Sequence, residues 1–78
     1  MTQIEKVQMG NWELKYYVRE LEEVFGVRIE RHGAGEVISE ETCGITASYE
    51  EAQRWVRKMA EGGVTPLTLH AIVDDMVG

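Results

Sequence analysis

Three side chains in this sequence could together support nucleophilic chemistry, namely Cys43, His70 and Asp74. A thiol becomes a nucleophile when an imidazole takes its proton and a carboxylate orients that imidazole. His70 and Asp74 are four residues apart, so on a helix they would share a face. That spacing is also common in surface pairs, and Cys43 lies in an apolar-leaning segment where a thiol is usually inert. We therefore predict no catalytic residue and no enzyme, with a Cys43-dependent enzyme as an alternative.

Metal-binding and cofactor-binding motifs are not apparent. The two histidines, His32 and His70, are 38 residues apart, and with one cysteine they give no metal-ligand spacing. Asp74 and Asp75 offer too few oxygen ligands for a calcium loop. The paired glycines at positions 33 and 35 and at 62 and 63 lack the residues of a phosphate-binding loop. We predict no cofactor and no metal.

Composition indicates one small folded domain over residues 1–78, with 44% hydrophobic residues and a net charge of −6 from 14 acidic and 8 basic residues. Phosphate contacts need clustered Lys and Arg, so this charge argues against binding to nucleic acid or to a membrane surface. The sequence has no 18-residue apolar run and no signal-peptide pattern at residues 1–10. A single cysteine cannot form an internal disulfide, so we expect a cytoplasmic protein.

The last third of the chain predicts two short helices joined by a glycine turn. Ser48 can cap the first helix, and Glu51 three residues later can complete a capping box. Gly62 and Gly63 end this helix, since glycine adopts the left-handed conformation of a C-terminal cap. Apolar residues follow at helical spacing on one face: Ala52, Trp55, Val56, Met59 and Ala60.

A second helix is predicted to begin at Thr65 and Pro66, because threonine caps and proline is favoured at the first helical position. Its apolar stripe consists of Leu69, Ile72, Val73 and Met76. The helix pair resembles a helix-turn-helix DNA reader, which would direct four residues toward a major groove: Thr65, Leu67, Thr68 and His70. The absence of Lys and Arg from this helix, and the two aspartates near its end, argue against DNA reading.

The first half of the chain predicts an antiparallel sheet. Residues 1–9 have a weak pattern and form either a frayed end or a short strand. Residues 12–18 alternate apolar and polar side chains as a strand does, although residues 12–25 also fit a helical period. Residues 25–30 and 36–43 supply two further strands. The predicted fold is therefore a single α+β domain in the order β-β-β-α-α, with a three-stranded antiparallel sheet followed by two helices.

Several short segments resemble a known family: Tyr16-Tyr17-Val18, residues 25–29, residues 64–69 and Val73-Asp74-Asp75. They are similar to an uncharacterised family of small acidic proteins, a domain of unknown function, from clostridial-type Firmicutes. The resemblance covers most of the chain after Tyr16. It implies no activity and no site residues.

Acidic residues are the most distinctive surface feature. They predict a small, non-enzymatic interaction or regulatory module whose partner presents a basic protein surface. The residues expected to bind that partner are Tyr17, Glu20, Glu22, Glu23, Glu30, Glu40, Glu41, Asp74 and Asp75. Alternatives are a phage-type inhibitor of a nucleic-acid-binding protein, in the manner of anti-CRISPR proteins, and a plain solvated surface. A homodimer is a further alternative, because a three-stranded sheet leaves unpaired edges.

Overall fold

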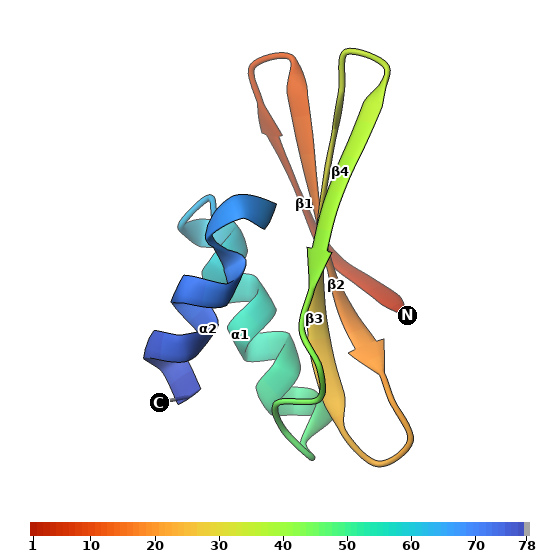
Figure 1. The fold of residues 1–78 in the computed structure, drawn as a ribbon, viewed down its shortest axis with the longest axis vertical. Coiled ribbons are helices and arrows are strands. Elements are labelled where there is room, and N and C mark those ends of the chain that lie inside the picture. Colours follow the sequence, from red (N-terminus) through yellow and green to blue (C-terminus); the bar gives the residue numbers. More distant parts are fainter. Residues whose placement is uncertain (78) are drawn as a thin grey trace.

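The computed structural model describes the backbone of residues 1–77 and the side chains of residues 1–75. Four antiparallel strands pair in chain order, and two helices lie on one side of the sheet (Figure 1). The strands are β1 (Thr2–Met9), β2 (Trp12–Glu20), β3 (Phe25–Gly33) and β4 (Glu36–Glu41). The helical elements are α1 (Tyr49–Glu61), a single 3-10 turn η1 (Pro66–Thr68) and α2 (Leu69–Val77).

The prediction of three strands is wrong, because residues 2–9 form the full strand β1. This strand pairs with β2 over nearly all its length, and a register shift between Gln3 and Glu5 marks a β-bulge. The bulge interrupts the two-residue alternation, and an edge strand buries little, so the sequence pattern of β1 is weak. The ambiguity over residues 12–25 is also settled, since β2 has a strand on each side and ends at Glu20.

One face of the sheet and the two helices enclose the core. The predicted inward side chains of β2 and β3 are buried: Leu14, Tyr16, Val18, Val27 and Ile29. The stripe of α1 is confirmed for four residues, while Trp55 is only partly buried. In α2, Leu69 and Val73 are buried and Ile72 packs against the core, whereas the predicted Met76 side chain lies outside the described residues.

The N-terminus of α1 is capped as predicted in one respect and not in another. Ser48 Oγ accepts a hydrogen bond of 3.2 Å from the Glu51 backbone N–H. The expected return bond from the Glu51 side chain is replaced by Thr46, whose Oγ1 accepts from the Ser48 N–H at 3.1 Å. The Thr46 hydroxyl therefore accepts the hydrogen bond from the Ser48 backbone N–H that the Glu51 side chain would accept in a capping box.

Two contacts fix the helix pair on the sheet. At one end, the connection after β4 pairs with β3 through Phe25 and Thr46, and the Phe25 and Tyr49 rings meet edge to face at 5.4 Å. At the other end, the buried Tyr16 hydroxyl donates a 2.7 Å hydrogen bond to the Val64 carbonyl oxygen in the α1–α2 turn. Desolvation of its phenol raises the pKa of Tyr16 to about 12.

Candidate functional site

The face of the sheet that the helices leave uncovered carries a network of ion pairs. Arg28 on β3 contacts two carboxylates, Glu30 at 2.9 Å and Glu41 at 2.7 Å. It also donates a 3.0 Å hydrogen bond to Ser39. Arg19 Nε lies 2.6 Å from the other oxygen of Glu41. Charged side chains of β2, β3 and β4 thus neutralise one another on this face, and Arg28 and Glu41 do so from directly opposite positions on neighbouring strands.

Glu30 is the centre of this network, with Tyr17 donating to it at 3.1 Å and His32 Nε2 at 2.8 Å. Burial by itself would raise the pKa of Glu30, but the hydrogen bonds from Arg28, His32 and Tyr17 outweigh it and lower that pKa. Burial, and then the neighbouring Glu30, raise the pKa of Tyr17. The carboxylate is therefore held ionised among partners from its own sheet.

The charges of the uncovered face nearly balance. The strand registers place four basic and three acidic side chains on it: Lys6, Lys15, Arg19, Arg28, Glu13, Glu30 and Glu41. Three predicted partner-binding residues, Tyr17, Glu30 and Glu41, lie here, and all three already have partners within the chain. The net negative charge of the protein is consequently concentrated elsewhere, on the helix side, the turns and the β4 edge.

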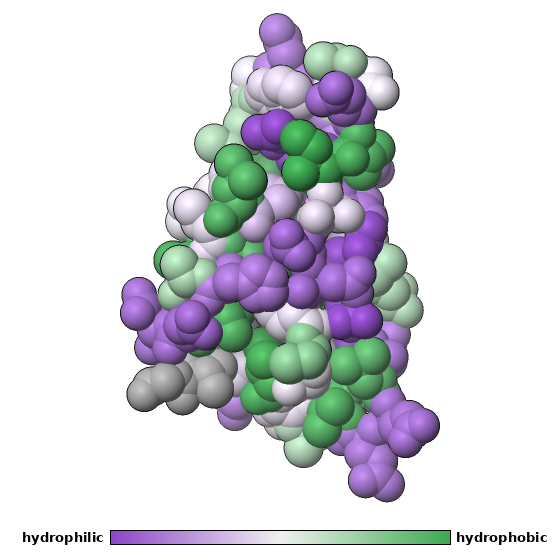
Figure 2. All heavy atoms as spheres, viewed as in Figure 1, coloured by the Kyte–Doolittle hydropathy of each residue, from purple (hydrophilic) through white to green (hydrophobic). Residues whose placement is uncertain are grey.

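Strand β4 is an edge of the sheet, since it pairs only with β3. It lies in front in Figure 1, and Figure 2 shows a hydrophilic band across the middle of that side, between apolar groups near the two ends. The register directs Glu36 and Glu40 to the helix side and Glu41 to the uncovered side. His70 of α2 lies 3.5 Å from Glu40, and Asp74 follows one turn later.

The remaining predicted partner-binding residues are dispersed. Glu20 ends β2, where it lies 2.6 Å from the N-terminal amino group and accepts a 2.8 Å hydrogen bond from Thr2. Glu22 and Glu23 are exposed in the β2–β3 turn, and Asp75 is exposed on α2. The predicted residues therefore do not form one continuous patch, because successive strands and turns carry them to different sides of the domain.

The structure does not join Cys43, His70 and Asp74 into a catalytic set. Cys43 is exposed in the connection that follows β4, whereas the ion-pair partner of His70 is Glu40. Among residues 1–75, no hydrogen bond or ion pair links any two of the three. In that same part of the chain, no three His, Cys, Asp or Glu side chains gather as metal ligands would.

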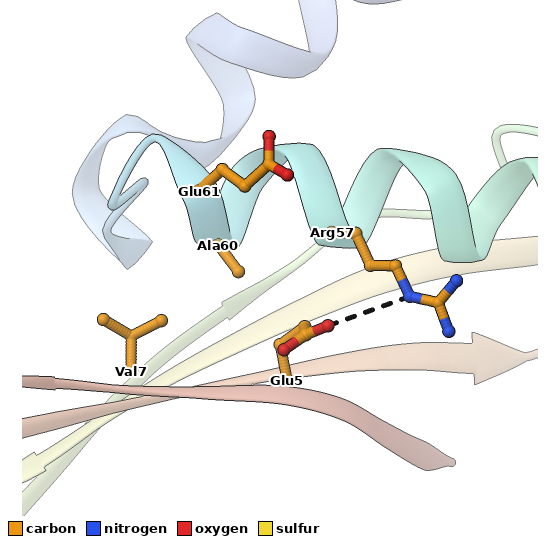
Figure 3. A pocket seen from close by; sticks show the side chains of 5 residues that line it. All are labelled: Glu5, Val7, Arg57, Ala60 and Glu61. Carbon is orange, nitrogen blue, oxygen red and sulfur yellow. Dashed lines mark ion pairs between the residues drawn. The ribbon is translucent and has the colours of Figure 1, made fainter.

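A hollow lies between β1 and α1, with a volume of about 340 Å³. Figure 3 shows the Arg57 side chain of α1 reaching toward Glu5 of β1, with 3.7 Å between Nε and Oε1. Val7, Ala60 and Glu61 complete its lining. Both charged side chains of this contact are largely exposed, so water screens their attraction. The hollow therefore offers little electrostatic attraction to a ligand.

A second hollow, lined by Met9, Trp12, Leu14, Arg31 and Thr65, was missed by sequence reasoning. The available signal was Arg31 itself, which continues the alternation of Val27 and Ile29 and so falls on the covered face. A charged residue at a position where the alternation predicts an apolar side chain indicates a possible site, because burying a charge costs free energy unless a partner group pairs with it.

No helix among the described residues is long and apolar enough to cross a membrane. No curated protein and no solved structure matches the chain. A family model does match, over residues 1–78. The predicted resemblance to a domain of unknown function is thereby confirmed at the level of a family, and the chain belongs to the Family of unknown function (DUF6514).

Proposed function

We propose that this protein is a non-enzymatic interaction module that binds an extended, basic segment of a partner protein along β4. The observation that supports this most strongly is an acidic edge strand on whose outer side no strand of the described residues pairs. An edge strand presents backbone N–H and C=O groups that an added strand can pair with. Recognition by strand addition takes affinity from those main-chain bonds and specificity from the side chains beside them.

Charge selects the kind of segment that β4 would accept. Glu36 and Glu40 border the edge on the helix side, and both are exposed. Lysine or arginine at alternate positions of an added strand would meet these carboxylates, since successive side chains of a strand alternate between faces. Leu67 of η1, which packs close to β4, is 84% exposed and offers an apolar contact beside them.

The other free edge, β1, lacks this acidic character. Its charged residues are Glu5 and Lys6, and Glu5 already faces Arg57. A second copy pairing along β4 would bring glutamates together, which is unfavourable, so a homodimer through the sheet would use β1. Light scattering during size-exclusion chromatography tests that second candidate, because a monomer near 8.9 kDa at high concentration contradicts it.

The partner class follows from the same chemistry. Basic extended segments are common on nucleic-acid-binding proteins, so inhibition of such a protein is one form that this module could take. Competition between the module and nucleic acid for the captured partner would distinguish inhibition from plain association.

The exposed thiol of Cys43 fits a reducing compartment, and we infer the cytoplasm on that ground.

The test uses the isolated protein and a defined probe, an eight-residue peptide of alternating lysine and valine, followed by amide NMR shifts. We expect the largest shifts in Glu36–Glu41 and small ones in Thr2–Met9, so that the two edges of one molecule serve as probe and control. An alternating glutamate and valine peptide should cause no comparable change. Equal shifts at both edges, or none at β4, would contradict the proposal.

Charge reversal at matched sites sharpens the test. The double variant Glu36→Lys/Glu40→Lys should weaken peptide binding by roughly tenfold or more, because close opposite charges at an interface are replaced by like charges. The control is Glu22→Lys/Glu23→Lys, which changes the net charge equally in the exposed β2–β3 turn. If both variants weaken binding to the same extent, the peptide responds to net charge and the β4 edge is not its site.

A further inference from the structure

Arg31 carries a positive charge on the covered face of the sheet and forms no ion pair with a carboxylate of the described residues. Its neighbours across the strands are Leu14 on β2 and Ile38 on β4. Its Nε is buried and has no hydrogen-bond partner, and no ion pair of Arg31 occurs among the described residues. Arg19 and Arg28, on the opposite face, each contact a glutamate at less than 3 Å. Arg31 is therefore a partly buried cation whose Nε donor has no hydrogen-bond partner among the described residues.

Trp12 holds the Arg31 guanidinium in place. The guanidinium carbon lies 4.4 Å from the centroid of the Trp12 ring, a cation–π contact. The indole is itself fixed against Gly33, where an added Cβ would come within 2.3 Å of the ring. Glycine at this position lets the ring lie directly on the β3 backbone. The arginine is thus positioned before any ligand arrives, which reduces the entropy lost on binding.

The space beside this stacked pair has the size of a small organic group. It has a volume of about 160 Å³ and is lined by Met9, Trp12, Leu14, Arg31 and Thr65. Met9 is 45% exposed, so the hollow borders solvent. The β1–β2 and β3–β4 hairpin ends of the sheet project past the helix pair (Figure 1). The residues that line the hollow come from β1, β2 and β3 and from Thr65, which precedes η1. Its lining combines apolar walls with one cation and one hydroxyl.

We propose that this hollow binds a carboxylate carried on a short apolar group. The carboxylate pairs with the Arg31 guanidinium, whose planar donors match two oxygens at once. The apolar part packs against Trp12, Leu14 and the flexible Met9 thioether, which adapts to different shapes. Such a ligand supplies an ion-pair partner that Arg31 does not find among the described residues, although the overall charge of the protein is −6. This inference is independent of strand addition at β4.

The chain provides an internal control in its second tryptophan. Trp55 on α1 borders a different surface with Arg54 and Lys58, two exposed cations. Titration with butyrate, followed by NMR of the two indole N–H groups, should shift the Trp12 signal and leave that of Trp55 nearly unchanged. Butyramide, which has a similar shape and no charge, should bind at least about tenfold more weakly, since hydrogen bonds to charged groups are the stronger ones.

Variants test the role of the guanidinium. Arg31→Lys keeps the charge and loses the planar fork, and it should weaken butyrate binding severalfold, whereas Arg31→Gln should abolish it. Arg54→Gln removes a cation beside Trp55 and should leave the Trp12 response unchanged. Equal binding of butyrate and butyramide to the wild type, or equal responses of Trp12 and Trp55, would overturn the proposal even if an Arg31 variant failed to fold.

A further titration identifies the source of the carboxylate. N-acetyl-leucine imitates the end of a peptide chain, and N-acetyl-leucinamide is its uncharged control. Tighter binding of N-acetyl-leucine than of butyrate would indicate a protein C-terminus, and the reverse order a free aliphatic acid. Either order supports a carboxylate site, provided that the matching amide binds at least about tenfold more weakly. Failure of both acids to shift the Trp12 signal would refute it.

Discussion

Replacement of Tyr16 by phenylalanine tests how the helix pair is held on the sheet. The Tyr16 side chain is fully buried, and its hydroxyl donates a 2.7 Å hydrogen bond to the Val64 carbonyl oxygen. Tyr16→Phe keeps the ring and removes only this oxygen. The bond joins residues 48 positions apart, so its loss should be felt as global destabilisation and not as local fraying.

The expected magnitude combines two effects. A net hydrogen bond contributes about 1 kcal/mol, and a carbonyl left without a partner adds a desolvation penalty of similar size. We therefore expect Tyr16→Phe to lower the free energy of unfolding by about 1–2 kcal/mol near pH 7. For a domain of this length that corresponds to a fall in Tm of roughly 5–10 °C. Tyr49→Phe is the matched control, since the Tyr49 hydroxyl forms no hydrogen bond among the described residues and the ring contact with Phe25 is kept, so its cost should be below about 0.5 kcal/mol.

The dependence on pH gives a second, independent readout. The pKa of Tyr16 is raised from 10.0 to about 12 by burial, so the folded state retains the phenol proton that the unfolded chain loses. The resulting stabilisation is fully present below pH 10 and is lost as the pH rises through 12. Across two pH units it amounts to roughly 2–3 kcal/mol. Tyr16→Phe should abolish this part of the alkaline loss.

The assay is urea unfolding followed by circular dichroism, at neutral pH and at several values between 9 and 12. Wild type should be the more stable protein at neutral pH, and its advantage over Tyr16→Phe should shrink as the pH rises above 10 and disappear before pH 12, because only the wild type loses the Tyr16 contribution. A difference below about 0.3 kcal/mol at neutral pH, together with parallel loss above pH 10, would refute the reasoning. That outcome would mean that water replaces the hydroxyl at Val64 without cost.

Three other predictions concern separate features. Gly33→Ala should destabilise the fold by about 1–3 kcal/mol and shift the Trp12 indole resonance, because the new Cβ overlaps the ring, whereas Gly62→Ala should change stability by less than about 0.5 kcal/mol in the same urea assay. Ser48→Ala should cost about 1 kcal/mol through loss of the bond to the Glu51 N–H, with Ala47→Ser as a near-neutral control by thermal unfolding. Glu30 has a lowered pKa, so its stabilisation is present above pH 4.5 and is lost as the pH falls through the folded-state pKa. Glu30→Gln should therefore reduce the difference in unfolding free energy between pH 7 and pH 3, and an unchanged difference would contradict the network around Glu30.

Local signals in the sequence were sufficient for α1, whereas the second helix was expected from Thr65 and Pro66 and residues 66–68 form a 3-10 turn before α2. Three signals define α1: the Ser48 cap, the apolar stripe from Ala52 to Ala60 and the glycines that follow. Each acts between residues within one or two helical turns, so it can be recognised from the sequence alone. The inward faces of β2 and β3 were predictable for a similar reason. Their alternating residues are buried on one side only, and that asymmetry fixes which face turns inward.

Strand pairing decided the two regions that the sequence left ambiguous or assigned wrongly, residues 2–9 and residues 12–20. Strand β1 has a weak pattern by itself and becomes a strand because β2 supplies its hydrogen-bond partners, and the same pairing excludes a helix over residues 12–20. The candidate sites depended even more on tertiary structure. Composition predicted an acidic surface, but only the strand register shows that Glu30 and Glu41 are neutralised by arginines.

The sequence by itself determined the presence of two helices after the strands, the inward faces of β2 and β3 and the excess of negative charge, since these follow from composition and short-range periodicity. Tertiary structure alone decided which charges remain available for a partner. It left Glu36 and Glu40 exposed on the edge strand β4 and set Arg31 against Trp12 with no ion pair among the described residues. The physical reason is that charge compensation acts between residues distant in the chain, and only the pairing of strands brings them within a few ångströms of each other.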